Sequence, residues 1–153
     1  MIIEFKPIGF VHSPFLNPKD IQRERNVRPD GFADIQGEIE VIQDYESGLS
    51  DIDGFSHLYI LFHFHQSRGG HLTARPPFDN KERGVFATRS PNRPNPLGLT
   101  VVRLLVRKRN RLIIANMDMI EGTPVLDIKP YTLRDRKDDI SPGWLAPYQD
   151  TVD

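Results

Sequence analysis

The sequence contains no cysteine, which excludes disulfide frameworks, thiolate metal sites and cysteine nucleophiles. It also lacks a long hydrophobic run. No apolar stretch reaches the roughly 18 residues that a membrane span requires, and the longest, residues 58–64, is interrupted by His63. The amino terminus, MIIEFKPIGF, has an early glutamate and no basic segment followed by an apolar one, so it does not resemble an export signal. We therefore expect a cytoplasmic protein with no membrane partner.

A strong overall charge is missing as well, because 20 Lys and Arg residues face 21 Asp and Glu residues and the net charge is −1. The average hides a basic middle. Residues 68–111 carry eleven cations and only two anions, Asp79 and Glu82, for a local charge of +9. This pattern is compatible with one positive face for a phosphate backbone. It is equally compatible with ion pairs between the basic middle and its acidic flanks.

The composition, 38% hydrophobic and 27% charged over 153 residues, is typical of one globular domain. We expect a single domain over residues 1–153, with about residues 140–153 as a tail. Apolar and β-branched runs predict strands over residues 8–12, 38–42, 55–64, 99–106, 111–117 and 125–130. The basic turn RKRN between two of them predicts a hairpin. Thirteen prolines argue against long helices, and residues 45–49 are the best candidate for a short one. The sequence predicts a mainly β fold, a small barrel or sandwich with short helical turns.

The segment GVFATRSPNRPNPLGLT, residues 84–100, is the first candidate for function. Its three prolines fix φ at three points, so the loop is stiff. Between them lie two guanidinium groups and two amides (Arg89, Asn92, Arg93 and Asn95). On a stiff loop such groups make an anion-binding and hydrogen-bonding site at a low entropy cost. The alternative is a proline-rich connection whose arginines pair with the acidic segments.

The segment GFSHLYILFHFHQS, residues 54–67, is the second candidate. In a strand, His57, His63 and His65 share one face because side chains alternate. His63 and His65 lie close enough to share a metal, with a third ligand from elsewhere, for example Asp118, His12 or His71. Zinc sites usually show tighter ligand spacing. We therefore favour histidines that line a barrel or cleft and expect no metal.

The third candidate is DMIEGTPVLDIKPY, residues 118–131. Its carboxylates, amine and phenol lie around a GTP turn (Asp118, Glu121, Asp127, Lys129 and Tyr131). They are suited to a general base and a hydrogen-bonding clamp. A solvated hairpin with a surface ion pair is the alternative. The glycine-rich, P-loop and GxSxG motifs of common nucleotide-binding proteins and serine hydrolases are absent.

Four segments, IGFVHSPF, GFSHLYILFHFHQS, GVFATRSPNRPNPLGLTVVRLL and DMIEGTPVLDIKPY, span residues 8–131. Together and in this order they closely resemble the TrmO (TsaA-like) family of tRNA methyltransferases. The resemblance implies methylation of N6 of threonylcarbamoyladenosine at tRNA position 37, with S-adenosylmethionine as the cofactor. It also implies a small β-barrel unlike the doubly wound methyltransferases, and a homodimer with the cofactor near the subunit contact. Bacterial members carry a further C-terminal domain. This chain stops about 22 residues after IKPY and is similar to the shorter archaeal form.

By the same resemblance, the cofactor is bound by Pro29, Asp30, Gly31, His65, Gln66, Arg89, Leu99, Asn116, Met117 and Asp118. The acceptor nitrogen carries a carbonyl substituent, so a group must relieve it of its proton during transfer. Our candidates for this catalytic role are Asp118, Asp127 and Tyr131. Arg93 and Asn95 are our candidates for RNA contact, and Lys129 for the threonyl carboxylate or a phosphate. The alternatives are a cofactor-binding barrel with another small-molecule or RNA substrate, and a non-enzymatic binding module.

Overall fold

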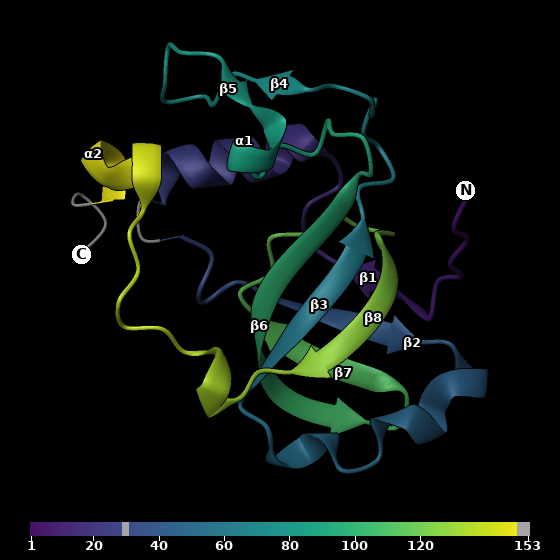
Figure 1. Cartoon of the computed structure of the whole chain (residues 1–153). Helices are drawn as coiled ribbons and strands as arrows, with labels where there is room; N and C mark the ends of the chain where they lie inside the picture. Colours follow the sequence, from purple (N-terminus) through teal and green to yellow (C-terminus); the bar gives the residue numbers. More distant parts are fainter. Residues whose placement is uncertain (29–30, 150–153) are drawn as a thin grey trace.

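A closed barrel of six strands forms the centre of the molecule, in the order β1–β2–β7–β6–β3–β8 (Figure 1). The computed structural model describes residues 1–28 and 31–149. The barrel strands are β1 (Gly9–His12), β2 (Gln36–Val41), β3 (His57–His63), β6 (Leu97–Lys108), β7 (Arg111–Ala115) and β8 (Pro124–Pro130). All six neighbouring pairs are antiparallel. The mainly β fold, and the barrel that the family resemblance implies, are confirmed.

Alternating side chains fill the barrel, as the pleat of a strand requires. In β3, Leu58, Ile60 and Phe62 are buried, whereas the intervening residues are only half-buried. Each of the five remaining barrel strands adds apolar residues to the same core, for example Val11, Ile39, Val102, Leu112 and Val125. The predicted hairpin is confirmed: β6 and β7 pair directly, with Lys108 opposite Arg111.

The helix α1 (Pro18–Val27) was not predicted, because the number of prolines argued against helices. Pro18, however, occupies the first turn, where its missing N–H and fixed φ are tolerated. Asn17 caps the helix through the N–H groups of Lys19 and Asp20. The predicted helical turn near residues 45–49 is part of the 3-10 helix η1 (Gln43–Leu49). None of the described helices is long and apolar enough to span a membrane.

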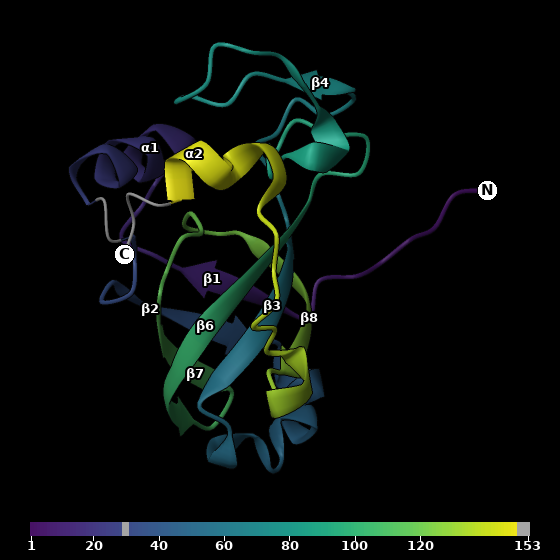
Figure 2. The ribbon, with the colours of Figure 1, turned by 60° about the vertical axis from the view of Figure 1, so that its left-hand side comes forward.

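Two ends of the barrel differ in what covers them (Figures 1 and 2). The lower end carries η1, η2 (Ile52–Gly54) and the β6–β7 turn. The upper end carries α1, the ribbon of β4 (Thr73–Ala74) and β5 (Arg83–Gly84), and the short helix η3 (Val85–Ala87). After η4 (Leu133–Asp135) the chain returns to the upper end. There η5 (Gly143–Leu145) and α2 (Ala146–Gln149) lie beside α1 in both views. These two helices fall within the segment that the sequence predicts as a tail.

Candidate functional site

The turn after β3 and the proline loop, residues 88–96, are bound to each other at the upper end. Phe64 donates its N–H to Pro96 O at 2.8 Å. The Ser67 hydroxyl donates to Pro91 O at 2.7 Å and to Asn92 Oδ1 at 3.0 Å. These bonds hold the His65–Gln66 turn beside the loop. Two segments predicted to bind one ligand are therefore brought together.

Arg93 braces the loop that carries it. Its Nη1 donates to Thr88 O at 3.0 Å and to Ser90 O at 3.1 Å. Both bonds are partly buried, and they engage Nη1 within the protein. Asn95, the other residue predicted to contact RNA, is exposed. Its backbone carbonyl accepts the N–H of Leu97 at 2.7 Å, where β6 begins.

Arg89 and Leu99, both predicted to bind the cofactor, are in direct contact. Arg89 Nη2 donates to Leu99 O at 2.8 Å. Both residues are exposed at the surface. An arginine has five N–H donors in a planar fork. With one N–H directed at Leu99 O, the guanidinium keeps further donors that suit a carboxylate or phosphate.

Asp118 is the most unusual group at the upper end. Thr100 donates its hydroxyl to Asp118 Oδ2 at 3.1 Å. The other oxygen, Oδ1, is buried and has no hydrogen-bond partner among the described residues. Burial raises the pKa of Asp118, against the opposing effects of the Thr100 hydrogen bond and the positive charges of Arg25 and Arg89. A buried acceptor without a donor is costly, so Oδ1 is available to a donor from outside the chain.

The segment that leads to Asp118 is fixed on both sides. Asn116 adopts the left-handed region, with φ of 68°, which asparagine tolerates better than most residues. Its Nδ2 donates to Val101 O of β6 at 2.6 Å. Met117 is fully buried and donates its N–H to Ile35 O at 3.0 Å. The bond to Ile35 brings the chain after Gly31 to residues 116–118.

The loop before Ile35 contains three predicted cofactor residues. Gly31 has a φ of 86° and donates its N–H to Arg28 O at 3.0 Å. A positive φ of this size favours glycine. Pro29 and Asp30 lie outside the described residues.

The predicted face of three histidines is wrong for His65, because β3 ends at His63. His65 lies in the turn that follows. Desolvation and the neighbouring His63 lower the pKa of His65. Within residues 1–28 and 31–149, no group of three or more His, Asp or Glu side chains is placed to hold a metal ion.

Asp127, Lys129 and Tyr131 lie apart from Asp118. Asp127 and Lys129 form an ion pair at 2.8 Å, as in the surface alternative of the sequence analysis. Tyr131 follows the end of β8 and donates its N–H to His57 O, at the start of β3. Seven residues of strand span about 23 Å, and Asp118 precedes β8. The structure therefore does not bring Tyr131 to the residues of the upper end.

Two residues that act on Asp118, Thr100 and Arg25, were not predicted from the sequence. Thr100 faces the barrel interior opposite Ile60, and strict alternation along residues 97–102 would have marked it as a lone polar group in the core. Arg25 lies on α1, and its charge acts on Asp118. No signal pointed to Arg25, because the helix itself was not expected.

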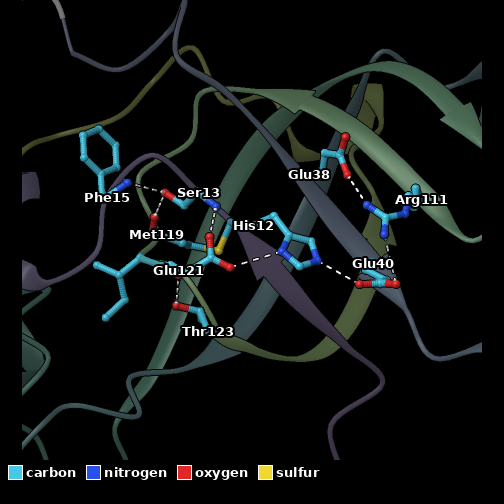
Figure 3. A network of polar contacts seen from close by, with 10 residues as sticks. His12, Ser13, Phe15, Glu38, Glu40, Arg111, Met119, Glu121 and Thr123 are labelled. Carbon is cyan, nitrogen blue, oxygen red and sulfur yellow. Dashed lines mark hydrogen bonds and ion pairs between the residues drawn. The ribbon is translucent and has the colours of Figure 1, made fainter.

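A network of polar contacts anchors the turn after Asp118 to the barrel wall (Figure 3). His12 Nδ1 lies 3.1 Å from Glu121 Oε1, and His12 Nε2 lies 2.8 Å from Glu40 Oε2. Glu121 also accepts the N–H of Ser13 at 3.0 Å. The hydrogen bond with Glu40 raises the pKa of His12, with a smaller rise from Glu121, against partial burial. The cationic form, with both ring nitrogens donating, suits two carboxylates.

The basic middle of the sequence is divided in space. Four of its cations lie at the β6–β7 turn of the lower end (Arg107, Lys108, Arg109 and Arg111). Six others lie on the loops and ribbon of the upper end (Arg68, Arg75, Lys81, Arg83, Arg89 and Arg93). Ten residues of β6, 97–106, separate the two groups, a span of about 33 Å, and Arg103 lies between them. The positive charge therefore forms two clusters, not one face.

Comparison with known proteins gives consistent matches. Residues 10–135 match the family described as tRNA-methyltransferase O N-terminal domain. A Pyrococcus abyssi protein named as a probable S-adenosyl-L-methionine-binding protein is 43% identical over 146 residues, 95% of this chain and 77% of that protein. The Escherichia coli tRNA (adenine(37)-N6)-methyltransferase is 38% identical over 138 residues, 84% of this chain and 57% of the enzyme.

Solved structures agree. A crystal structure of TrmO superposes with a TM-score of 0.75 at 36% identity, over 94% of this chain and 64% of that one. TrmO from Pseudomonas aeruginosa gives a TM-score of 0.73 at 33% identity, over 94% of this chain and 63% of that one. The chain thus spans somewhat less than two thirds of these longer proteins.

Proposed function

Because the chain belongs to the tRNA-methyltransferase O N-terminal domain family, we propose that it methylates N6 of threonylcarbamoyladenosine at position 37 of tRNA, with S-adenosylmethionine as the methyl donor. Relatives named as adenine-37 methyltransferases and as S-adenosyl-L-methionine-binding proteins support this proposal. The observation that carries it is the buried, unpartnered Oδ1 of Asp118 beside Arg89. The names of these relatives specify adenine 37 but not its modification. The threonylcarbamoyl group on that adenine is part of our proposal.

The groups at the upper end fit this cofactor. S-adenosylmethionine offers an ammonium, hydroxyl groups and an adenine amino group as donors, and one carboxylate as an acceptor. Asp118 Oδ1 requires a donor, and the fork of Arg89 suits a carboxylate. We infer that Gly31, His65, Gln66, Leu99, Asn116 and Met117 line the same site, together with Pro29 and Asp30. When bound, the cofactor supplies an electrophilic methyl group on a sulfonium.

For the proton of the acceptor nitrogen we propose Asp118. Its pKa is raised by burial, which makes the carboxylate a stronger base than one in water. A carboxylate that takes this proton restores the lone pair of a nitrogen otherwise delocalised into the carbonyl. Much of the remaining catalysis comes from alignment of the donor and acceptor.

We propose that the protein is a cytoplasmic homodimer. The outer surface of β6 presents Leu97 and Leu99, 44% and 48% exposed, opposite His63 and Leu61 of β3. Exposed apolar side chains that are grouped on a sheet favour a protein contact. Asp127 faces outward on this surface, opposite Leu61. In this proposal Asp127 and Tyr131 act across the contact, near the partner's methyl-transfer site.

Sedimentation of the purified protein tests the dimer. Leu97→Glu places a charge on the proposed contact and is expected to shift the sedimentation coefficient to that of a monomer. The matched control is Leu133→Glu, which lies elsewhere on the surface and is exposed already. A wild-type protein that sediments as a monomer at micromolar concentration refutes the dimer.

Upper-end cations support contact with RNA, since phosphate neutralisation dominates nucleic-acid affinity. Arg93 and Asn95 are our proposed RNA contacts at this end, and Lys129, near the end of β8, is our candidate for the threonyl carboxylate or a phosphate. Arg93→Ala is expected to weaken tRNA binding more than cofactor binding in separate titrations. Equal losses in the two titrations would assign Arg93 only the bracing role seen in its bonds to Thr88 and Ser90.

The decisive experiment is methyl transfer from labelled S-adenosylmethionine to two versions of one tRNA. One carries threonylcarbamoyladenosine at position 37 and the other carries plain adenosine, and nucleoside mass spectrometry locates the product. We expect methylation of the modified tRNA alone. Methylation of plain adenosine would retain the enzyme but remove the threonylcarbamoyl requirement.

A second function is favoured by the names of the archaeal relatives. Those from Pyrococcus abyssi and Archaeoglobus fulgidus are named only as S-adenosyl-L-methionine-binding proteins. The second candidate is therefore a cofactor-binding barrel with another small-molecule or RNA substrate, or a binding module without turnover. Cofactor binding by calorimetry, with no methylation of either tRNA, would favour it.

A further inference from the structure

The C-terminal segment makes a specific contact with the loop that leads to Arg89. Trp144, in η5, donates its indole Nε1–H to Ala87 O at 2.8 Å. Ala87 is the last residue of η3, two positions before Arg89. A segment about 60 residues away in the sequence thereby fixes the backbone next to a proposed cofactor residue.

The Trp144 ring is itself held by an aromatic cluster. It stacks on Phe78, with ring centroids 6.1 Å apart and an interplanar angle of 22°. The Arg83 guanidinium, from β5, lies 4.7 Å from the centroid of the Trp144 ring. Arg83 in turn pairs with Asp79 at 2.9 Å, and the Tyr148 ring packs on Phe78 at 4.8 Å. Each of these contacts limits the freedom of the indole.

The backbone from η3 to Arg89 continues this chain of contacts. Val85 is buried and donates its N–H to Leu72 O at 2.9 Å. Thr88 donates its N–H to Val85 O at 3.0 Å and accepts a hydrogen bond from Arg93. The Arg89 guanidinium then reaches Leu99 O. The carbonyl of Ala87 is the point in this run where the C-terminal segment is attached.

The aromatic cluster is separate from the cores that hold the fold. Neither of the two buried clusters of the described residues contains Trp144, Phe78 or Tyr148. The barrel core comes from the strands and from Leu49, Met117 and Met119. Loss of the indole therefore affects the upper-end loops before it affects the barrel.

We propose that Trp144 is a positioning residue: it fixes residues 85–88 so that Arg89 is presented to the ligand in one orientation. This inference rests on the proposed function, because Arg89 is assigned there to the cofactor. Preorganised groups bind more tightly because little ordering remains at the time of binding. The C-terminal segment is thus part of the cofactor end.

Two substitutions separate the contacts of Trp144. Trp144→Phe keeps a ring on Phe78 and Arg83 but removes the N–H to Ala87, and we expect about threefold weaker binding of S-adenosylmethionine. Trp144→Ala removes both, and we expect at least about tenfold weaker binding and a similar loss of kcat/KM. Ile140→Ala, an exposed residue of the same segment, is the matched control and is expected to bind as the wild type does.

Tryptophan fluorescence gives a second readout. A purely structural role of Trp144 would not make its emission respond to the ligand. Trp144 is the only tryptophan, so its emission reports on the contact directly. We expect S-adenosylmethionine to change the emission of the wild type, with a midpoint equal to the Kd from calorimetry. An emission that stays constant through saturation contradicts the inference.

The outcomes are distinguishable when circular dichroism shows that both variants are folded at the assay temperature. Graded loss of affinity from wild type through Trp144→Phe to Trp144→Ala supports the positioning role. Wild-type affinity in folded Trp144→Ala overturns it and leaves the proposed function intact. If the wild type itself binds no S-adenosylmethionine, the proposed function and this inference both fail.

Discussion

The two ends of the barrel are closed by different physical means. At the lower end, η1 and η2 place apolar side chains over the barrel, and a groove of about 420 Å³ remains among Tyr45, Leu49, Ile52 and Phe55. At the upper end, side chains hold the loops through hydrogen bonds to backbone carbonyls, as at Arg89, Arg93 and Asn116. At the lower end Tyr45 and Phe55 stay partly exposed, whereas at the upper end the buried Asp118 Oδ1 has no hydrogen-bond partner among the described residues.

This difference identifies which end is built for a ligand. Apolar packing is non-directional and is satisfied within the chain. Polar groups are directional, and a buried one that the chain does not satisfy requires a partner from outside the chain or a role in chemistry. Long loops at the upper end supply these groups, and the barrel beneath them supplies a rigid support. The comparison can be tested by perturbing each end separately.

The largest effect is expected from Asp118→Asn at the upper end. The amide keeps the shape and can still accept the Thr100 hydrogen bond, but it cannot take a proton. We expect kcat for tRNA methylation to fall by about 10² to 10³. The affinity for S-adenosylmethionine is expected to fall about tenfold, because an amide that accepts from Thr100 leaves no acceptor at the Oδ1 position. Single-turnover assays and calorimetry measure the two quantities. If the affinity falls and kcat is unchanged, Asp118 serves the cofactor and not the proton.

The next largest effect is expected at the lower end, from Leu49→Ala. Leu49 is buried within the barrel core, and its truncation removes apolar contacts and leaves a cavity. We expect the free energy of unfolding to fall by about 2–4 kcal/mol, measured by urea denaturation. The folded variant is expected to bind S-adenosylmethionine as the wild type does. Leu133→Ala, at an exposed site, is the control and should change stability by less than about 0.5 kcal/mol. A weakened cofactor affinity would mean that the two ends are coupled.

Elements whose side chains alternate were predictable, because the pattern is local. The apolar run of residues 55–64 predicted β3 as a strand buried on both faces, whereas the structure buries only the face of Leu58, Ile60 and Phe62. The hairpin at RKRN was predictable for the same reason. The helix α1 was not, since the count of prolines ignored that Pro18 stands at a helix start.

Contacts in the site were less predictable than the strands, because sequence distance and spatial distance differ in a barrel. Asp118 and Tyr131 are close in sequence, yet the intervening strand carries them apart by about 3.3 Å per residue. Thr100 lies far from Asp118 in sequence and donates to it. The family resemblance pointed to Arg89 and Leu99, which are in contact. The burial of Asp118 needed the fold.

A smaller effect on stability is expected from Gly98→Ala in β6, near the upper end. Gly98 pairs directly with Phe62, whose ring lies where a Cβ would be. We expect a loss of about 1–3 kcal/mol from overpacking. Gly54→Ala at the lower end, where a Cβ meets no atom within 4 Å, is the control. In the double variant with Phe62→Leu the loss at Gly98 should shrink. An unchanged loss would place its cause in the backbone and not in the ring.

The smallest effect is a pH dependence of the network around His12 on the barrel wall, where Glu40 also pairs with Arg111. Contact with Glu40 and Glu121 raises the pKa of His12 above its ordinary value of 6.5. Its contribution to stability is therefore complete below pH 6.5 and is lost as the pH rises through the folded-state pKa. Contact with His12 lowers the pKa of Glu40 below its ordinary value of 4.5, so that contribution is complete above pH 4.5 and is lost on acidification. The network should be strongest between these two values.

The measurement is the Tm of the wild type minus that of His12→Gln, from pH 4 to pH 9. The His12, Glu40 and Glu121 side chains are about two-fifths exposed, so solvent screening should limit the maximum difference to about 1–3 °C. We expect the maximum between pH 5 and pH 6.5 and a decline towards pH 9. The matched control, His71→Gln, replaces an exposed histidine and should show no such maximum. Because Leu49 makes apolar contacts in the barrel core, Leu49→Ala should give a Tm difference that is nearly independent of pH. If its difference also peaked near pH 6, the contrast between a polar and an apolar end would be lost.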